Sequence, residues 1–248
     1  MPVGDMQYPH PSVGSRVPGP GIDLQPLVLT ACPVVTGGRH MVKVTIVFNS
    51  KEDTIRVNDR ILRKIESPKA PHLSAAVSRL NRRILVILNP FSGKKCAPKL
   101  WETYVAPIFR TSHIDYDFIK TDYERHAVEI AKNVKLDKYD GIAVISGDGL
   151  ILEVISGFLM RADRERALKM PLAHIPGGTS NGLAASICFQ CNEPFSARNV
   201  FCTEMALMVV RPRYLPLRIN HVQTELDGDK PMFMSITWGL IADIGSFY

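Results

Sequence analysis

The sequence of 248 residues lacks any apolar run near the length of about 18 residues that a membrane-spanning helix requires. The apolar segment LVLTACPVV, at residues 27–35, is short, is interrupted by Pro33 and has no cationic stretch directly before it. These features argue against a secretory signal. The sequence therefore predicts neither a transmembrane segment nor a cleaved leader.

Cysteine is scarce as well, with five residues spread thinly along the chain. An odd, scattered set does not form a disulfide framework, and it favours a reducing cytosol. Cys188 and Cys191 form a CxxC motif, but a zinc site needs a second close pair, which Cys96 and Cys202 do not provide. We interpret these four residues as ordinary thiols and expect no metal ligand among them.

Charge of one sign is only slightly in excess. The net charge of +6 suits an anionic partner such as a nucleotide, a lipid headgroup or a nucleic acid, without discriminating among them. A solvated surface with a small cationic excess explains it equally well. With 46% hydrophobic and 22% charged residues, the chain has the composition of a soluble globular protein of one large or two small domains.

Composition divides the chain into four parts. Residues 1–26 are rich in Pro, Gly and Ser without apolar periodicity, which predicts a disordered tail. Within residues 27–80, the alternation of apolar and polar residues at 40–57 predicts a hairpin in a small β element, followed by a linker. Residues 81–204 have the pattern of an α/β domain, and residues 205–248 that of the start of a β-rich domain.

The segment from Arg82 onward alternates strand and helix patterns four times. The continuous apolar run RRILVILNP is typical of a buried parallel strand, and Pro107 predicts an early end for the helix after it. Three further strand–helix pairs follow, with the strand segments IDYDFIKT, YDGIAVISGDG and MPLAHIPGG. This order predicts a three-layer α/β/α domain with a parallel sheet. From Ala206 the chain turns β-rich, with a hairpin at LDGDKP.

Three loops of this domain follow strands and carry glycine or hydroxyl side chains. Ligands of open α/β sheets bind beyond the carboxyl ends of the strands, where helix N-termini offer unpaired N–H groups. The first loop, Asn89–Lys95 (NPFSGKK), is not a Walker A loop, because the GxxxxGK spacing places Leu88 where glycine is needed. Its Ser92, Gly93 and two lysines can bind phosphate through backbone amides, or form a plain strand-to-helix turn.

The second loop is Ser146–Leu150 (SGDGL). It fails the dinucleotide fingerprint GxGxxG, because Leu152 stands where the third glycine belongs. Glycines on both sides of Asp148 let the backbone approach a ligand, and the acid can then hold Mg²⁺ or accept a hydroxyl proton. Asp-Gly is also a common turn pair, so a plain turn is the alternative.

The third loop lies in Pro176–Ser186 (PGGTSNGLAAS), directly before a helical pattern. An N-cap by Thr179 or Ser180 would explain a hydroxyl there. A cap does not require Gly177 and Gly178 as well, so this loop favours phosphate binding. Because three such loops follow successive strands of one sheet, the interpretation of each as a phosphate-binding loop is strengthened.

Four segments resemble, in order and spacing, the diacylglycerol kinase-like catalytic domain and, within that superfamily, the sphingosine kinases. They are LVILNPFSGKK, KTDYERHA, VISGDGLILEVISG and IPGGTSNGLAAS. The resemblance covers about residues 82–243, and SITWGLIAD is typical of the sphingosine kinase branch. It implies the nucleotide-binding fold shared by NAD kinases and diacylglycerol kinases. It also implies transfer of the ATP γ-phosphate, with Mg²⁺, to the primary hydroxyl of a sphingoid base.

The resemblance also implies a set of site residues. Those expected near ATP are Asn89, Pro90, Phe91, Thr121, Asp122, Tyr123, Glu124, Arg125, Glu153, Gly178, Thr179 and Ser180. Those expected near the substrate are Ser146, Gly147, Asp148 and Gly149, with Asp148 as the catalytic proton acceptor or orienting group. Phosphoryl transfer depends on charge neutralisation and in-line placement more than on a strong base, so a carboxylate can serve.

The sequence departs from the family pattern in several places. The first loop has Phe91 and Ser92 where the family commonly has small or basic residues and a second glycine, and TSNG replaces Gly-Ser-Gly-Asn. Gly245 stands where sphingosine kinases carry the aspartate that binds the lipid amine. Compared with the family, we expect the sequence to be truncated before most of the β-sandwich domain that follows.

These departures leave two alternatives beside a sphingosine kinase. One is a truncated, inactive form that binds nucleotide or partners, and the other is a diacylglycerol, ceramide or NAD kinase of the superfamily. The partners expected are a sphingoid lipid and, transiently, a membrane surface, but no nucleic acid. The expected location is the cytoplasm, with peripheral membrane association.

Overall fold

The structure is a computed structural model that describes residues 27–31, 34–35, 38–39, 42–46, 52–53, 55–57, 82–193, 198–225 and 228–235. The chain divides into two compact units. The first unit consists of Met1–Leu29 and Lys43–Ser67, and the second unit consists of Thr30–Val42 and Pro68–Tyr248. The predicted disordered tail, nearly all of the predicted linker and Gly245 lie outside the described residues.

The N-terminal strands pair differently from the sequence prediction. The pairs are β1 (Leu27–Ala31) with β4 (Val42–Ile46), and β2 (Val34–Val35) antiparallel with β3 (Gly38–Arg39). The hairpin predicted within residues 40–57 is wrong, because residues 52–53 and 55–57 are helical. Charged residues in that stretch have a weak strand propensity, and a partner from earlier in the chain pairs with β4 instead.

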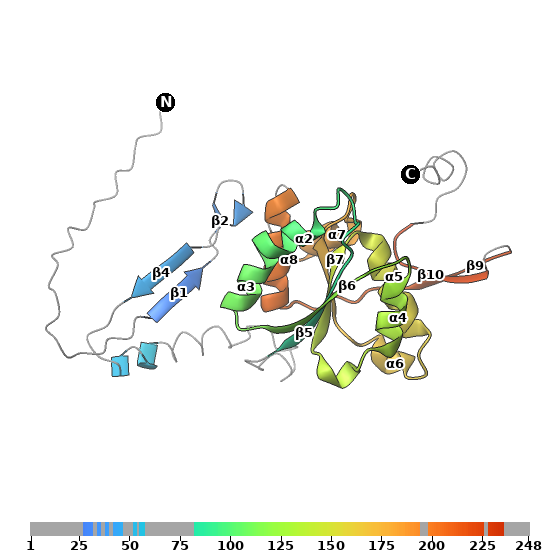
Figure 1. Cartoon of the computed structure of the whole chain (residues 1–248), viewed down its shortest axis with the longest axis horizontal. Coiled ribbons are helices and arrows are strands. Elements are labelled where there is room, and N and C mark those ends of the chain that lie inside the picture. Colours follow the sequence, from blue (N-terminus) through green and yellow to red (C-terminus); the bar gives the residue numbers. More distant parts are fainter. Residues whose placement is uncertain are drawn as a thin grey trace, which may run out of the picture. The chain divides into compact units, whose positions relative to one another are not determined.

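A four-stranded sheet forms the centre of the second unit (Figure 1). In spatial order its strands are β6 (Asp115–Lys120), β5 (Arg83–Leu88), β7 (Gly141–Ser146) and β8 (Leu172–Pro176), and all neighbours are parallel. The main helices between and after them are α4 (His126–Asn133), α5 (Asp148–Leu159), α7 (Gly182–Gln190) and α8 (Arg198–Val210). Two short helical turns are η3 (Leu136–Lys138) and α6 (Arg164–Ala167). The predicted α/β fold with a parallel sheet is confirmed.

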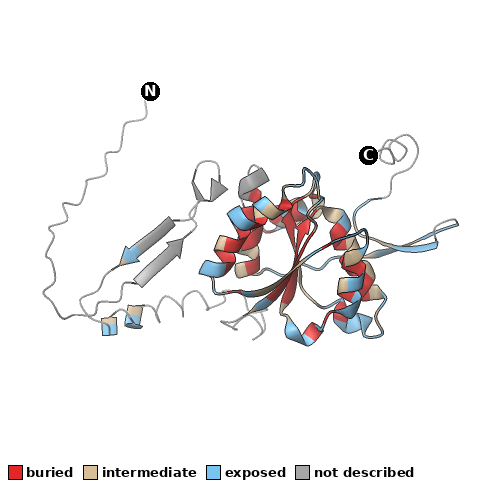
Figure 2. Ribbon diagram, in the orientation of Figure 1, coloured by how far each residue is buried: buried red, intermediate tan, exposed pale blue. Residues whose placement is uncertain are grey.

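Both faces of the sheet are buried, as Figure 2 shows by the red strands between two layers of helices. Successive strand residues point to opposite faces, so the apolar run of β5 serves both layers. Val86 and its neighbours two positions away pack with α7 and α8, whereas Leu85 and Ile87 pack with α4 and α5. This two-sided burial explains why the strand sequences are continuously apolar.

The helical segment after the first loop does not end at Pro107. It consists of α2 (Ala97–Leu100), a π-helical turn η2 (Trp101–Val105) and α3 (Ala106–Thr111). The wide turn shifts the hydrogen-bonding register, with the Ala106 N–H donating to the Trp101 carbonyl, so that Pro107 falls in the first turn of α3. Proline is tolerated at that position because the N–H it lacks would have no partner within the helix.

The segment after Glu204 begins as helix rather than strand. Helix α8 continues through Val210, so the β-rich character predicted from Ala206 is wrong for residues 206–210. A short apolar run such as ALMVV does not distinguish a strand from a buried helix. Further on, β9 (Asn220–Thr224) and β10 (Gly228–Met232) form the antiparallel hairpin predicted at LDGDKP.

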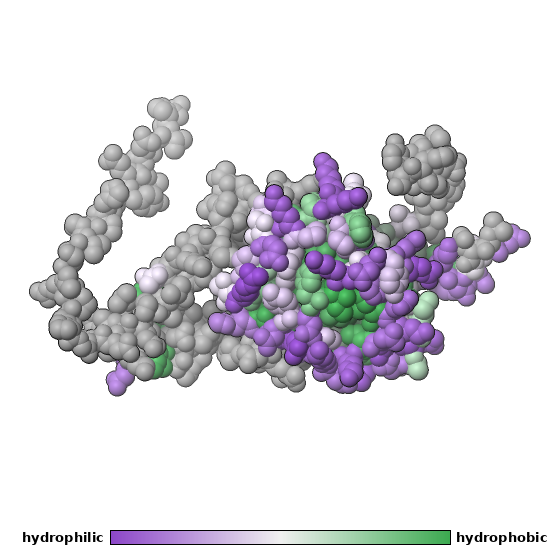
Figure 3. All heavy atoms as spheres, viewed as in Figure 1, coloured by the Kyte–Doolittle hydropathy of each residue, from purple (hydrophilic) through white to green (hydrophobic). Residues whose placement is uncertain are grey.

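Polar and charged side chains cover most of the viewed face of the second unit, with an apolar area near its middle (Figure 3). In the part of the chain that the structure describes, no helix has both the length and the apolarity to cross a membrane.

Helices α4 and α5 approach closely at Gly157, which is buried. A methyl group there would collide with the Val128 carbonyl oxygen and would lie 2.7 Å from the Ala131 Cβ. Only hydrogen fits between these two backbones.

We expect Gly157→Ala to lower the free energy of unfolding by about 1–3 kcal/mol, because the added methyl forces the two helices apart. Gly149→Ala in the same helix is the matched control, since nothing lies within 4 Å of its Cβ position. The control should be neutral or stabilising by up to about 1 kcal/mol through helix propensity. Urea titration of both variants checks this, and equal stability would contradict the close approach.

Candidate functional site

The first and second loops are joined by a serine side chain. Ser92 Oγ accepts a hydrogen bond from the Gly147 N–H at 3.1 Å and lies 3.0 Å from Ser146 Oγ. Ser92 therefore fixes the Asn89–Lys95 loop against the start of the loop that carries Asp148. Ser92 departs from the family pattern, and in this structure its side chain joins two loops.

The second and third loops are in direct backbone contact. The Gly177 N–H donates to the Ser146 carbonyl at 2.9 Å. A Cβ on Gly178 would lie 2.7 Å from the Gly147 backbone nitrogen, and one on Gly93 would lie 3.1 Å from the Gly177 carbonyl oxygen. Gly93 also has φ +54°, a conformation that side chains disfavour. The glycines thus allow three loops to pack backbone to backbone at one edge of the sheet.

Asp148, the first residue of α5, connects that helix to α7. Its Oδ2 accepts the Gly182 N–H at 2.8 Å, and its Oδ1 accepts the Leu183 N–H at 2.9 Å. Bonds from N–H groups at a helix N-terminus to an anion are charge-assisted and complement the helix dipole. Each carboxylate oxygen keeps a second acceptor position. The predicted catalytic residue therefore caps a neighbouring helix and still has room for one more hydrogen on each oxygen.

Neither Thr179 nor Ser180, the caps considered as the alternative to phosphate binding, lies at the cap position of α7. The residue at the cap position is Asn181, in the left-handed region at φ 55°. Its side chain turns back to Gly178, accepting that residue's N–H and donating to its carbonyl, both at 2.8 Å. Thr179 and Ser180 are exposed in the loop between them.

A buried histidine that the sequence analysis did not select lies behind Asp148. His174 in β8 has Nε2 2.9 Å from the Ser146 carbonyl oxygen and Nδ1 3.6 Å from Asp148 Oδ1. Burial lowers its pKa from the usual range. One histidine in an apolar strand is most often a satisfied core residue, so only its spatial relation to Asp148 distinguishes it.

The residues expected on the adenosine side lie in the loop after β6. Thr121 is buried, and its N–H donates to the Leu88 carbonyl at 2.9 Å, next to the first loop. Tyr123 stacks on His126 with ring centroids 4.4 Å apart and donates its hydroxyl to Glu129 at 2.9 Å. The remaining members of the expected set in this loop, Asp122, Glu124 and Arg125, are exposed. An ordered aromatic pair therefore lies within an exposed, polar loop.

Glu153 points away from the third loop and towards the N-terminus of α4. Burial raises its pKa, whereas backbone N–H groups of Ala127 and Arg125 favour its charged form. Its Oε2 is buried with no hydrogen-bond partner among the described residues. Glu153 thus supports the Thr121–Arg125 loop from behind, and its predicted contact with ATP stays a prediction.

The first loop takes its shape from Asn89. The Asn89 Oδ1 accepts the Phe91 N–H at 2.9 Å, and the Asn89 N–H donates to the Ile145 carbonyl at 3.3 Å. Pro90 stands between Asn89 and Phe91 in the sequence, and the Phe91 side chain is 63% exposed. Of the three residues expected near ATP here, Phe91 is therefore the one with a freely accessible side chain.

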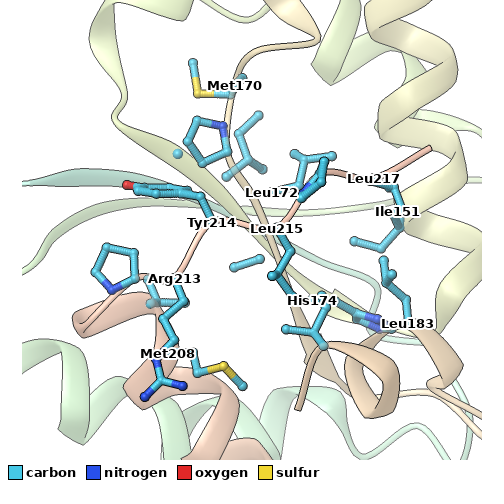
Figure 4. Close-up of a pocket in the computed structure, with 18 of the residues that line it drawn as sticks. Ile151, Met170, Leu172, His174, Leu183, Met208, Arg213, Tyr214, Leu215 and Leu217 are labelled. Atoms are coloured by element: carbon cyan, nitrogen blue, oxygen red, sulfur yellow. The ribbon is translucent and has the colours of Figure 1, made fainter. Parts of the chain in front are cut away.

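A cavity of about 980 Å³ lies along β8 (Figure 4). Its apolar lining comes from α5, β8, α7, α8 and the segment 212–219, and includes Ile151, Leu172, Leu183, Met208, Leu215 and Leu217. Leu183 and His174 line the cavity and also contact Asp148, through the Leu183 N–H and the His174 Nδ1. The carboxylate and the cavity therefore share two neighbours.

Cys188 and Cys202 are buried thiols. Burial raises the pKa of Cys188 and brings that of Cys202 to about 12, so both are protonated at neutral pH. No group of three or more histidine, cysteine or acidic side chains that could hold a metal occurs within the described ranges.

Comparisons with known proteins agree with the motifs. The diacylglycerol kinase catalytic domain family matches residues 83–207. Sphingosine kinase 1 of Arabidopsis thaliana is 36% identical over 165 residues, which are 66% of this chain and 32% of that protein. Human sphingosine kinase 1 is 32% identical over 162 residues, which are 65% of this chain and 42% of that protein.

A solved structure, a putative diacylglycerol kinase from Bacillus anthracis, is 23% identical, with a TM-score of 0.42, over 56% of this chain and 42% of its own. The chain thus aligns with about a third to two fifths of these relatives. Its match to the family profile spans all three loops and half of its length, and the chain belongs to the diacylglycerol kinase catalytic domain family.

Proposed function

We propose that this chain is the nucleotide-binding part of an ATP-dependent lipid kinase that phosphorylates the primary hydroxyl of a sphingoid base. The observation that carries the proposal is the position of Asp148. Its carboxylate is fixed between the N-termini of α5 and α7 and shares neighbours with an apolar cavity. Family membership and the similarity to sphingosine kinases support the same conclusion.

The phosphates of ATP suit the edge of the sheet where the three loops meet. The N-termini of α5 and α7 both lie there, and the positive ends of their dipoles favour anions. Lys94 and Lys95 are exposed in the first loop and can neutralise further charge. On the adenosine side, Tyr123 and Phe91 offer exposed aromatic surface to a base.

Magnesium fits this arrangement without a cage of protein ligands. Mg²⁺ in kinase sites keeps several waters and binds phosphate oxygens, with one or two carboxylates at most. When bound with ATP it would neutralise charge that develops on the transferred phosphoryl group. Because two amides already engage the Asp148 carboxylate, we assign that residue to the substrate hydroxyl rather than to the metal.

Asp148 can orient the lipid hydroxyl and take up its proton. One acceptor position on each oxygen is engaged by an α7 amide, and the remaining positions can accept the hydroxyl hydrogen. The two amides hold the carboxylate in one orientation, which is the positioning that phosphoryl transfer needs.

The cavity along β8 suits a hydrocarbon chain. Its volume of about 980 Å³ lies at the upper end of the usual range for small-molecule sites, and most of its lining is apolar. A dinucleotide substrate, as in an NAD kinase, would bring its charged groups against these apolar side chains. The apolar lining therefore favours a lipid acceptor.

An inactive, nucleotide-binding form is the second candidate. The chain aligns with 32% to 42% of the sphingosine kinases compared above, so other parts of such enzymes have no counterpart in the alignment. An assay of phosphate transfer to lipids, combined with a measurement of ATP binding, separates the two candidates.

We expect the purified chain to transfer ³²P from [γ-³²P]ATP to sphingosine in mixed micelles, with less transfer to diacylglycerol or ceramide. Calorimetric titration with Mg²⁺-ATP in parallel measures nucleotide binding. Binding without transfer to any lipid would refute the kinase proposal for this polypeptide and support the inactive form. Phosphorylation of NAD instead of sphingosine would assign the chain to the soluble kinases.

Asp148→Asn should reduce transfer about 100-fold or more while leaving the affinity for ATP within a few-fold. The amide side chain keeps one oxygen for an α7 N–H, so the cap is weakened rather than lost. Asp148→Ala is the contrasting variant and should also lose about 0.5–2 kcal/mol of stability. Equal losses of transfer and ATP binding in Asp148→Asn would contradict a role at the hydroxyl.

Gly178→Ala should weaken ATP binding about tenfold or more, because its methyl would collide with Gly147 and separate two of the three loops. Ser156→Ala serves as control, since it removes one hydrogen bond, at 2.8 Å to the Leu152 carbonyl, from the middle of α5. Titration calorimetry with thermal melts of both variants checks the prediction. Unchanged ATP affinity in folded Gly178→Ala would show that the loop contact does not form the nucleotide site.

A further inference from the structure

His174 is the one ionisable residue of strand β8, and its side chain is fully buried. Its Nε2 lies 2.9 Å from the Ser146 carbonyl oxygen. A carbonyl oxygen only accepts hydrogen bonds, so Nε2 carries the hydrogen. In the neutral ring, Nδ1 is then a bare acceptor.

That bare nitrogen faces a second acceptor. Nδ1 lies 3.6 Å from Asp148 Oδ1 and has no hydrogen-bond partner among the described residues. Burial lowers the pKa of His174, while the Ser146 carbonyl and the Asp148 carboxylate raise it. Before any proton is taken up from the substrate, His174 Nδ1 and Asp148 Oδ1 are therefore two acceptors with room for a single proton between them.

Among the described residues, one charged group interacts with the ring. Asp148 on α5 is the charged group that faces it, and β7 contributes only the Ser146 carbonyl. On the side of α7 lies the apolar side chain of Leu183 (Figure 4). The Asp148 carboxylate is thus the charged group that contacts Nδ1 in the described part of the chain.

The geometry points to His174 as a positioning residue that holds, together with Asp148, the proton released by the substrate hydroxyl. The inference rests on the proposed function, which makes Asp148 the acceptor. The hydroxyl O–H bond breaks and its proton passes to the carboxylate. The hydroxyl oxygen bonds to the γ-phosphorus, and the bond from that phosphorus to the ADP oxygen breaks. The proton then stays between Oδ1 and Nδ1 until it returns to solvent.

This arrangement resolves a conflict in the role of Asp148. The Gly182 and Leu183 amides both donate to the carboxylate, so a proton localised on one of its oxygens would occupy an acceptor position beside the bonds that cap α7. With Nδ1 as a second acceptor, the proton can be held while both amide bonds persist.

Nuclear magnetic resonance tests the pair directly on the ¹⁵N-labelled chain. The sequence has seven histidines, and loss of one set of imidazole signals in His174→Gln assigns His174. We expect the Nε2–H tautomer at neutral pH, protonation only below the usual histidine range, and a further lowering of that pKa in Asp148→Asn. A hydrogen on Nδ1, or a titration that Asp148→Asn leaves unchanged, would overturn the inference.

Two matched variants separate positioning from a purely structural role. His174→Gln can retain a donor near the Ser146 carbonyl but loses Nδ1, whereas His174→Asn retains an acceptor near the Nδ1 position and loses the donor. We expect Gln to lower kcat about 10- to 100-fold with KM for ATP little changed, and Asn to lower it less. The acid limb of the kcat–pH profile should move to lower pH in Gln, because the proton loses its second acceptor.

The opposite order, with Gln close to wild type and Asn impaired, would show that only the bond to Ser146 matters and would overturn the inference. If the wild-type chain phosphorylates no lipid, the proposed function fails, while the tautomer and the response to Asp148→Asn still decide whether the pair shares a proton.

Discussion

The two hydrogen bonds that the Asp148 carboxylate accepts from the Gly182 and Leu183 amides organise the candidate site. They join the N-termini of α5 and α7, which would otherwise be two separate ends with unpaired N–H groups. A half-buried anion at two positive helix ends is stabilised by both, so its position is well defined. The same residue therefore connects the loops and carries the group that we propose meets a substrate hydroxyl.

The second acid of α5 makes a parallel connection. Glu153 follows Asp148 by five positions, which places the two side chains about 140° apart around the helix. One consequently reaches the N-terminus of α7 and the other that of α4. Helix α5 is thus linked both to the loop expected to bind adenosine and to the loop expected to bind phosphate. A displacement of α5 would move both, which ties the two halves of the site together.

Much of the fold was predictable because strands buried on two faces, such as β5 and β7, have continuous apolar sequences. The errors occurred where local pattern does not determine structure. The run ALMVV in α8 fits a strand or a buried helix, and β4 pairs with β1 rather than with the residues that follow it. The three loops were recognisable from glycine and hydroxyl residues. The function of individual glycines was not, because it depends on which backbones meet.

The position of His174 relative to Asp148 could not be predicted from the sequence. Its distance from Asp148 depends on the register that places it beside Val144 in the neighbouring strand and on the direction of α5 after β7. Neither follows from the residues around it. A neutral ring that already donates from Nε2 has only an acceptor left, and that acceptor faces a carboxylate that accepts hydrogen bonds from two amides. Two acceptors remain in contact in a buried site only where the rest of the fold holds them there, as strand register and helix capping do here.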